Sequence, residues 1–409
     1  MRAVARAGEL LRQGQKVIIY DCGGDAALLA LSGLDGHFGL RPTALSDSSP
    51  VLWGKKLDGM SIISPRDAAE QFPDAWWLVT NFLNRAAGIQ FLIGLGIIPE
   101  KIINYVPYER RTSCRYLENY LHTDDTGLCF CCDAIGRATP PRIEATASAN
   151  VEQLVLIENQ LRQNTIQQLG NGTSCDFCSD MKESFFPKAR KIEMINFGGG
   201  GICNFQCCYC IASAKNKPKL QNGLDFVQVF SAYNQAGMLS EDIHVQFNSG
   251  EIGVHPKRAE MFHALGDATV SVLTNSSVYV PEIAEKLRYG DAIVNTSLDA
   301  GTRGTFRRVK GTDAWERVCD NLRRYAAIRK SSIVLKYIFL PGINDTPAEI
   351  DGFLQICKET AGAVQLSSEI YHPERITGAT RRAFQYMRES LEQEGILYRI
   401  SAGAFSDRK

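Results

Sequence analysis

From residue 191 onward, short apolar runs alternate with longer segments whose apolar residues recur at helical spacing. The apolar runs predict strands near Ile192, Ile243, Val270, Ile293, Val334 and Val364. The helical segments cover 225–236, 256–265, 281–288, 314–329, 347–360 and 381–393. Such alternation implies parallel strands joined by crossover helices. Because six repeats fall short of the eight in a closed barrel, the pattern predicts an open, partial (β/α)6 barrel.

The amino-terminal third reads differently. A strand at 16–20 is followed by a glycine-containing turn at 21–25 and a helix at 26–32, and a strand, a helix and a strand follow at 76–80, 85–95 and 102–106. This order predicts a small doubly wound, Rossmann-like α/β domain. Its glycine turn could hold a phosphate at a helix terminus, but Asp21 occupies the first glycine position of the dinucleotide fingerprint, so we do not expect a nicotinamide.

At the level of the fold, this amino-terminal domain resembles the nucleotide-sugar or acyl-donor binding halves of carbohydrate-modifying enzymes. The alternative is a domain that only positions a partner. Between the two α/β regions lies a cysteine-rich stretch with one helical run at 151–169. We therefore expect three parts: a Rossmann-like domain at 1–110, a cysteine-rich linker segment at 111–190 and a barrel at 191–409.

Three cysteines directly after the first barrel strand carry the clearest chemical signal. Cys203, Cys207 and Cys210 are separated by three and then two residues, so one loop can wrap three thiolates around an iron–sulfur cube. A cube with three protein ligands leaves one iron open for a ligand. Cys208 breaks the spacing, and the alternatives are a zinc knuckle or buried thiols.

This Cys-x3-Cys-x2-Cys spacing, with the aromatic Tyr209 before the last cysteine, resembles the signature of the radical S-adenosylmethionine (radical SAM) enzymes. The resemblance implies a [4Fe–4S] cluster whose open iron binds the amine and carboxylate of SAM. It further implies reductive cleavage of SAM to a 5'-deoxyadenosyl radical, which takes hydrogen from a substrate. An electron donor of the flavodoxin or ferredoxin type is then the expected partner.

Other candidate residues lie where the barrel strands end, the edge at which ligand sites of such folds cluster. The segment 248–251 is similar to the family's Gly-Gly-Glu motif, although Ser249 replaces the first glycine. The resemblance implies these SAM-binding residues: Tyr209, Ser249, Gly250, Glu251, Asn275, Ser297, Asp299 and either Arg307 or Arg308. For the two arginines, a solvated helix face is the alternative. The end of the last predicted strand offers these candidates for substrate contacts: Ser367, Ser368, Glu369, Tyr371 and His372.

A second group of cysteines lies in the linker segment. Cys129 with Cys132 and Cys175 with Cys178 form two Cys-x2-Cys pairs, which could share one metal site. Cys114 and Cys131 lie in the same stretch. Many radical SAM enzymes carry an auxiliary cluster, usually after the barrel, so this position departs from the common arrangement. An auxiliary iron–sulfur cluster, structural zinc and free thiols all remain open here.

Composition narrows the class of protein. The 45 basic and 45 acidic residues balance, which argues against nucleic-acid binding, and the apolar runs are too short to cross a membrane. Thirteen cysteines without an export signal favour metal and redox use in the cytoplasm over a disulfide framework.

These patterns lead to one functional hypothesis and two alternatives. We expect an enzyme that cleaves SAM and takes hydrogen from a small polar substrate, which is carbohydrate-linked or nucleotide-linked. A radical SAM enzyme that modifies a peptide is the first alternative. The second is a non-catalytic, metal-binding adaptor whose cysteines only hold its loops together.

Overall fold

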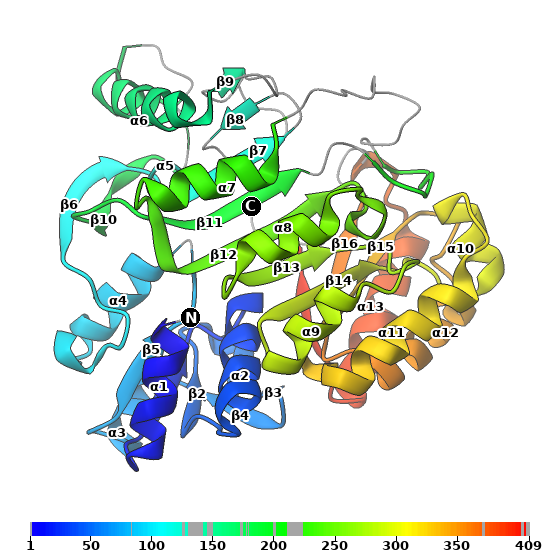
Figure 1. The fold of residues 1–409 in the computed structure, drawn as a ribbon. Helices are drawn as coiled ribbons and strands as arrows, with labels where there is room; N and C mark the ends of the chain where they lie inside the picture. Colours follow the sequence, from blue (N-terminus) through cyan, green and yellow to red (C-terminus); the bar gives the residue numbers. More distant parts are fainter. Residues whose placement is uncertain are drawn as a thin grey trace.

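A computed structural model describes residues 2–82, 84–124, 127–129, 142–144, 150–171, 175–176, 178, 180–198, 202–210, 224–369, 373–401 and 405. Within these residues, a small sheet at the amino terminus packs below a large, curved sheet that is covered by helices on its outer face (Figure 1). No helix among them combines the length and the apolar character needed to cross a bilayer.

The small sheet has the strand order β3-β4-β2-β1-β5. Its strands are β1 (Val17–Tyr20), β2 (Ala44–Ser46), β3 (Lys56–Leu57), β4 (Met60–Ile63) and β5 (Trp76–Val79). The helices of this part are α1 (Arg2–Arg12), α2 (Asp25–Phe38), α3 (Pro65–Gln71) and α4 (Arg85–Gly94). β1 pairs in parallel with β2 and β5, as the predicted doubly wound domain requires. The predicted strand at 102–106 is reduced to a single bridge between Ile102 and Trp77.

The large sheet contains ten strands in the order β17-β16-β15-β14-β13-β12-β11-β7-β8-β9. Its parallel core consists of β11 (Ile192–Gly198), β12 (Leu239–Ser249), β13 (Thr269–Leu273), β14 (Ala292–Ser297), β15 (Ile333–Phe339), β16 (Ala363–Ser368) and β17 (Leu397–Ile400). The covering helices are α7 (Phe226–Gln235), α8 (Arg258–Leu265), α9 (Pro281–Tyr289), α10 (Arg303–Lys310), α11 (Trp315–Arg329), α12 (Pro347–Thr360) and α13 (Gly378–Gln393).

All six predicted barrel strands are present as β11 to β16, and the sheet does not close, so the predicted partial barrel is confirmed. The sequence pattern missed two parallel neighbours. β17 extends the sheet beyond β16, and β7 (Tyr120–Asp124) pairs with β11. The pattern also missed α10, which follows β14 after a short turn.

Alternate residues of the barrel strands belong to two different cores. Val245, Val270, Val294 and Leu335 are fully buried and belong to the core that the strands share with α7 to α13. Because side chains alternate between the faces of a strand, their neighbours point to the concave face. The lower part of that concave face is apolar.

The amino-terminal domain fills this lower part. Ile293, Val334 and Ala363 pack in one core with residues of α1, α2 and the small sheet. The approach is tightest at Gly290, which has φ 79°, and a Cβ there would stand 2.0 Å from the carbonyl oxygen of Ser32 in α2. α2 therefore closes the base of the open barrel.

Charged pairs add to this apolar contact between the domains. Arg85 of α4 binds Glu193 of β11 at 3.1 Å, and both side chains are buried. His37 Nε2 lies 3.0 Å from Asp291, and Arg399 of β17 lies 2.7 Å from Asp25 at the start of α2. These ties fix the amino-terminal domain against the first, fourth and last strands of the core.

The segment expected as a linker contributes to two sheets. β7, β8 (Gly127–Cys129) and β9 (Arg142–Glu144) extend the large sheet, and β6 (Tyr108–Ser113) pairs with β10 (Lys182–Pro187) in a separate ribbon. α5 (Arg115–Asn119) and α6 (Val151–Gln167) complete this part. Three strands of the segment 111–190, which was expected as a linker, thus pair within the barrel sheet.

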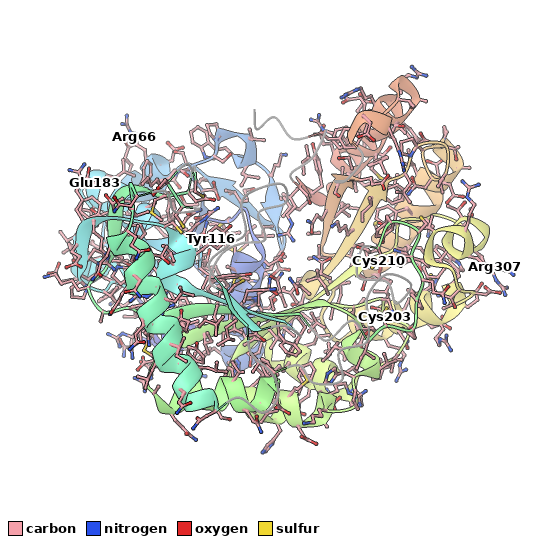
Figure 2. The ribbon with its side chains drawn as sticks, turned by 90° about the horizontal axis from the view of Figure 1, so that it is seen from above. Arg66, Tyr116, Glu183, Cys203, Cys210 and Arg307 are labelled. Carbon is pink, nitrogen blue, oxygen red and sulfur yellow. The ribbon has the colours of Figure 1, made fainter. Side chains whose placement is uncertain are left out.

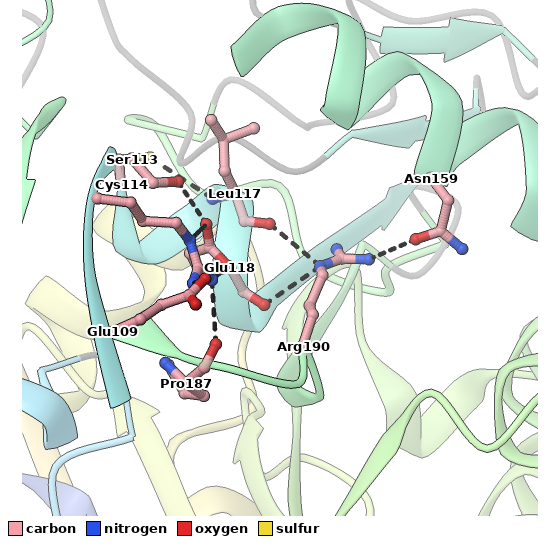
Figure 3. A network of polar contacts seen from close by, with 9 residues as sticks. Glu109, Ser113, Cys114, Leu117, Glu118, Asn159, Pro187 and Arg190 are labelled. Atoms are coloured by element: carbon pink, nitrogen blue, oxygen red, sulfur yellow. Dashed lines mark hydrogen bonds and ion pairs between the residues drawn. The ribbon is translucent and has the colours of Figure 1, made fainter. Parts of the chain in front are cut away.

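A buried polar network anchors this segment (Figure 3). Arg111 binds Glu118 at 2.7 Å, and the Ser113 hydroxyl donates to the same carboxylate. Arg190 binds the buried Glu158 of α6 at 2.8 Å and donates to the Leu117 carbonyl of α5. These contacts join β6, α5 and α6 around the chain that leads into β11.

His244 in β12 gives a pH-dependence prediction. The ring is fully buried, stacks on Phe82 at 4.8 Å and lies 3.0 Å from the Thr269 hydroxyl, and burial lowers its pKa to about 4. Because the unfolded chain binds this proton more readily, stability should fall by about 2 kcal/mol between pH 7 and pH 5. We expect urea unfolding at these two values to show this loss for the wild type and a smaller one for His244→Gln. Equal losses would contradict the assignment.

Candidate functional site

The loop with Cys203, Cys207 and Cys210 lies at the carboxyl end of the barrel strands. Glu251, just after β12, donates its backbone N–H to the Ile202 carbonyl at 2.7 Å. On the opposite side, the N–H groups of Gln206 and Cys208 bond to the carbonyls of Lys310 and Val309 in α10. The loop is thus fixed between the end of β12 and the last residues of α10; Cys203 and Cys210 are labelled in Figure 2.

The three thiols lie close enough to influence one another electrostatically. Burial, with smaller contributions from the charges of Asp299, Cys210 and Cys203, raises the pKa of Cys207 to about 12. Burial also raises the pKa of Cys203, and the charges of Glu251 and Cys210 raise it too. Lys310 acts in the opposite direction and favours the Cys207 thiolate. Cys208 is exposed and is held through its backbone.

This donor set fits an iron–sulfur cluster better than a single metal ion. Among the described residues, no three His, Cys, Asp or Glu side chains surround one point as the ligands of a single ion do. In a cluster each cysteine binds a different iron, so its sulfurs stand further apart. The Cys203 sulfur also accepts two hydrogen bonds, from the Phe205 N–H at 3.4 Å and from Asn275 Nδ2 at 3.9 Å. Three thiols in one loop, with hydrogen-bond donors at one sulfur, are of the ligand type that iron–sulfur clusters use.

Beneath the loop lies a buried network centred on Asp299. This carboxylate accepts from Lys310 Nζ and the Tyr209 hydroxyl, each at 2.5 Å, and from the Ile338 N–H at 2.7 Å. Lys310 Nζ also lies 2.7 Å from the Tyr209 oxygen. Asp299 has φ 55° and is completely buried. Asp299, which was expected to lie near SAM, binds Tyr209, Lys310 and the β15 backbone through its buried oxygens. The contacts with Tyr209 and Lys310 join Asp299 to the cysteine loop and to the end of α10.

The segment after β12 organises the next strand end. Gly250 adopts φ 75°, a conformation that favours glycine. The buried Glu251 carboxylate accepts from the Gly253 N–H, the Thr274 hydroxyl and the Asn275 N–H. Asn275 in turn reaches Cys203. Glu251 thus ties β12, β13 and the cysteine loop together, while the side chain of Ser249 lies outside the described residues.

The remaining predicted residues are spread around the rim. Ser297 ends β14 on the concave face. Arg308 is exposed and donates to the Gly342 carbonyl at 3.1 Å, and Arg307 points outward at the edge of the molecule (Figure 2). This placement favours the solvated helix face over a carboxylate clamp for both arginines.

At the end of β16, Ser367 and Ser368 are buried, and Ser367 donates to the Ser368 carbonyl. Glu369 follows them with its side chain 3.9 Å from Arg375. Tyr371 and His372 lie outside the described residues.

Sequence reasoning missed Lys310 and Asn204. Lys310 is one of four cations in a short helix, and nothing in that pattern separates the buried one from its exposed neighbours. Asn204 lies inside the cysteine loop and bonds to Asn275 at 2.8 Å and to Ser277 at 2.9 Å. Its position between the first two cysteines was the available signal.

In the second cysteine group, the structure places Cys114 beside Cys175 and Cys178. Cys114 begins α5, and the charges of Cys175 and Cys178 raise its pKa, after burial as the main cause. The Cys178 N–H bonds to the Cys175 carbonyl, so this pair forms a turn beside Cys114. Cys129 is buried in β8, and Cys131 and Cys132 lie outside the described residues. Among the described cysteines, Cys114 is therefore a neighbour of the Cys175–Cys178 turn.

Comparison with known proteins agrees with this geometry. Residues 199–354 match the family model of the radical SAM superfamily. These residues belong to the radical SAM superfamily. The match begins just before the cysteine loop and ends in α12, so the radical SAM domain includes the cysteine trio, Glu251, Asp299 and Lys310. Enzymes of this class use a [4Fe–4S] cluster and SAM.

Curated relatives of the radical SAM domain include two cyclases. GTP 3',8-cyclase of Gloeobacter violaceus is 27% identical over 150 residues, covering 35% of this chain and 46% of the relative. A probable GTP 3',8-cyclase of Saccharolobus islandicus is 25% identical over 217 residues, covering 52% and 67%. The chain spans about half the length of the first of these relatives.

Among solved structures, Streptococcus suis SuiB bound to precursor peptide SuiA aligns with a TM-score of 0.43 and 11% identity, over 65% of this chain and 57% of that one. A radical SAM methyltransferase from Sphaerobacter thermophilus aligns with a TM-score of 0.39 and 15% identity, over 62% and 84%.

Proposed function

We propose that this protein is an enzyme that reductively cleaves SAM and abstracts hydrogen from a small polar substrate at the mouth of the open barrel. The observation that carries this proposal is the trio of Cys203, Cys207 and Cys210, held together at the carboxyl edge of a partial barrel. When bound, the [4Fe–4S] cluster supplies the electron that splits SAM. The protein supplies the ligands, their orientation and the surrounding charge.

Specific roles follow from the contacts of each residue. Cys203, Cys207 and Cys210 hold the cluster, and the ammonium of Lys310 favours the Cys207 thiolate. Asn275 donates a hydrogen bond to the Cys203 sulfur, which stabilises its negative charge. The predicted SAM contacts of Gly250, Glu251, Asn275 and Ser297 remain part of the proposal, because these residues end the strands beside the loop.

The substrate is proposed to be a small polar metabolite that is nucleotide-linked or carbohydrate-linked. The curated relatives are GTP cyclases by name, and a nucleotide is a substrate of this kind. Peptide modification is the second candidate. Cleavage consumes one electron for each SAM, so a flavodoxin or ferredoxin is the proposed donor.

The test is anaerobic reconstitution with iron and sulfide, followed by dithionite and SAM. We expect 5'-deoxyadenosine to form, at least slowly, even without the substrate. An adaptor with structural cysteines would form none, and that result would overturn the proposal. Chromatographic detection of 5'-deoxyadenosine over time separates the two outcomes.

A second metal site is proposed at Cys114, Cys175 and Cys178. We expect a variant with Cys203, Cys207 and Cys210 all replaced by alanine to retain iron and acid-labile sulfide after reconstitution. Adding Cys178→Ser to that variant should release most of both. Zinc in place of iron, or equal iron in the two variants, would contradict an auxiliary cluster. Metal analysis by mass spectrometry and a sulfide assay provide the readout.

A further inference from the structure

The concave face of the barrel carries two rows of polar side chains. In the first row, the strand register aligns neighbours across β7, β11, β12 and β13: His122, Asn196, Gln246 and Ser271. In the second row, it aligns neighbours across β14, β15, β16 and β17: Ser297, Lys336, Gln365 and Arg399. Both rows lie on the concave face, and by register the first row continues from Ser271 to Ile293 of β14, four residues before Ser297.

The second row lies just below the cysteine loop. Two residues above Lys336, on the same face of β15, Ile338 packs with Val309 and with Tyr209 of the loop. Two residues of a parallel strand rise by about 7 Å. Below Lys336, Val334 already belongs to the core shared with α2. Lys336 therefore lies between the cysteine loop and the closed base of the barrel.

Two groups of the first row have no hydrogen-bond partner among the described residues. The Asn196 side-chain oxygen and the Ser271 hydroxyl are buried and make no hydrogen bond in the described part of the chain. Their residues are only 8% and 2% exposed. A buried polar atom without a partner costs about 1–3 kcal/mol. Such atoms are expected where a ligand or ordered water completes the hydrogen bonds.

Lys336 is the uncompensated charge of the second row. Burial lowers the pKa of its amine, while the Asp299 charge raises it and Lys310 and Arg399 lower it. Asp299 is already bound to Lys310, and Arg399 is bound to Asp25. Gln365, beside Lys336, accepts from Asn295 and Arg399. Among the described residues, no carboxylate forms an ion pair with Lys336.

Building on the proposed function, we infer that the concave face binds the substrate and that Lys336 holds an anionic group of it, a phosphate or a carboxylate. The amide and hydroxyl groups of Asn196, Gln246 and Ser271 bind its polar remainder. This places an anionic metabolite directly below the loop where SAM would bind.

The experiment measures how anions protect the Lys336 amine in the reconstituted protein. A limiting dose of acetic anhydride is applied anaerobically, and peptide mass spectrometry reads acetylation at Lys336 and at the exposed Lys188. We expect millimolar pyrophosphate or citrate to slow acetylation of Lys336 at least fivefold and to leave Lys188 unchanged. Sodium chloride at matched ionic strength should protect neither. Protection by pyrophosphate alone identifies a phosphate site, and protection by citrate alone identifies a carboxylate site.

Three results would overturn the inference: equal acetylation of Lys336 with and without both anions, equal protection by sodium chloride, or protection by SAM alone. The last would assign Lys336 to the SAM carboxylate. In a second measurement, Lys336→Met should weaken binding of radiolabelled pyrophosphate or citrate in equilibrium dialysis at least tenfold, with an unchanged circular dichroism spectrum. Unchanged binding would contradict the role of Lys336. Formation of 5'-deoxyadenosine by the wild type is assayed in parallel, so failure of the proposed function is detected independently of the anion site.

Discussion

Replacing Cys207 with alanine is expected to reduce formation of 5'-deoxyadenosine from SAM below detection. Cys207 is half-buried against the barrel core and interacts electrostatically with both of the other loop thiols. Its loss leaves two thiolates, which cannot hold a cube with a single open iron. The measurement is 5'-deoxyadenosine formed by the reconstituted, dithionite-reduced variant.

Cys208 provides a matched control for this prediction. It is the next residue in the loop and is exposed, and its described hydrogen bond to Val309 is made by the backbone. Cys208→Ala should therefore cleave SAM at the wild-type rate. If Cys207→Ala keeps full activity, or if both variants lose it equally, the assignment of the three ligands is wrong.

Replacing Lys310 with methionine is expected to cause the largest loss of stability. Lys310 and Asp299 are only 2% and 0% exposed and pair at 2.5 Å. Removing one partner of a buried ion pair typically costs about 3–5 kcal/mol, because the other charge stays buried. For a chain of 409 residues we expect the melting temperature to fall by roughly 5 °C. Differential scanning fluorimetry at neutral pH gives this shift.

Two further variants make the Lys310 result specific. Arg303 lies on the same helix, and its ion pair with Asp313 is exposed, so Arg303→Met should leave the melting temperature unchanged. Combining Lys310→Met with Asp299→Asn also removes the negative charge of Asp299, which Lys310→Met alone leaves without its cation. Asparagine tolerates the left-handed backbone of residue 299. The double variant should be more stable than Lys310→Met alone. A Lys310→Met variant as stable as Arg303→Met would show that the pair does not support the loop.

The barrel could be predicted from the sequence because its signals are local. Each of the six strands is a short apolar run next to a helix-period segment, and the cysteine spacing lies within one loop. The two missed strands are weaker signals. β17 contains the charged Arg399, and β7 begins directly after α5 in a stretch that reads as irregular.

The roles of the buried residues could not be predicted because they depend on tertiary contacts. Asp299 ends up below the loop since β15 and α10 converge on it, and no local pattern encodes that convergence. The same applies to Cys114, whose neighbours Cys175 and Cys178 come from the far end of the linker segment. The two polar rows of the concave face are visible in the sequence as single polar residues at alternate positions of apolar strands.

The central claim is that the Cys203, Cys207 and Cys210 thiolates hold a cluster whose open iron binds SAM. Electron–nuclear double resonance on the reduced protein tests it directly, with SAM carrying nitrogen-15 in its amino group. We predict a nitrogen-15 hyperfine coupling to the cluster that is absent when all three cysteines are replaced by alanine. A wild-type cluster spectrum that does not change when SAM is added would contradict the account.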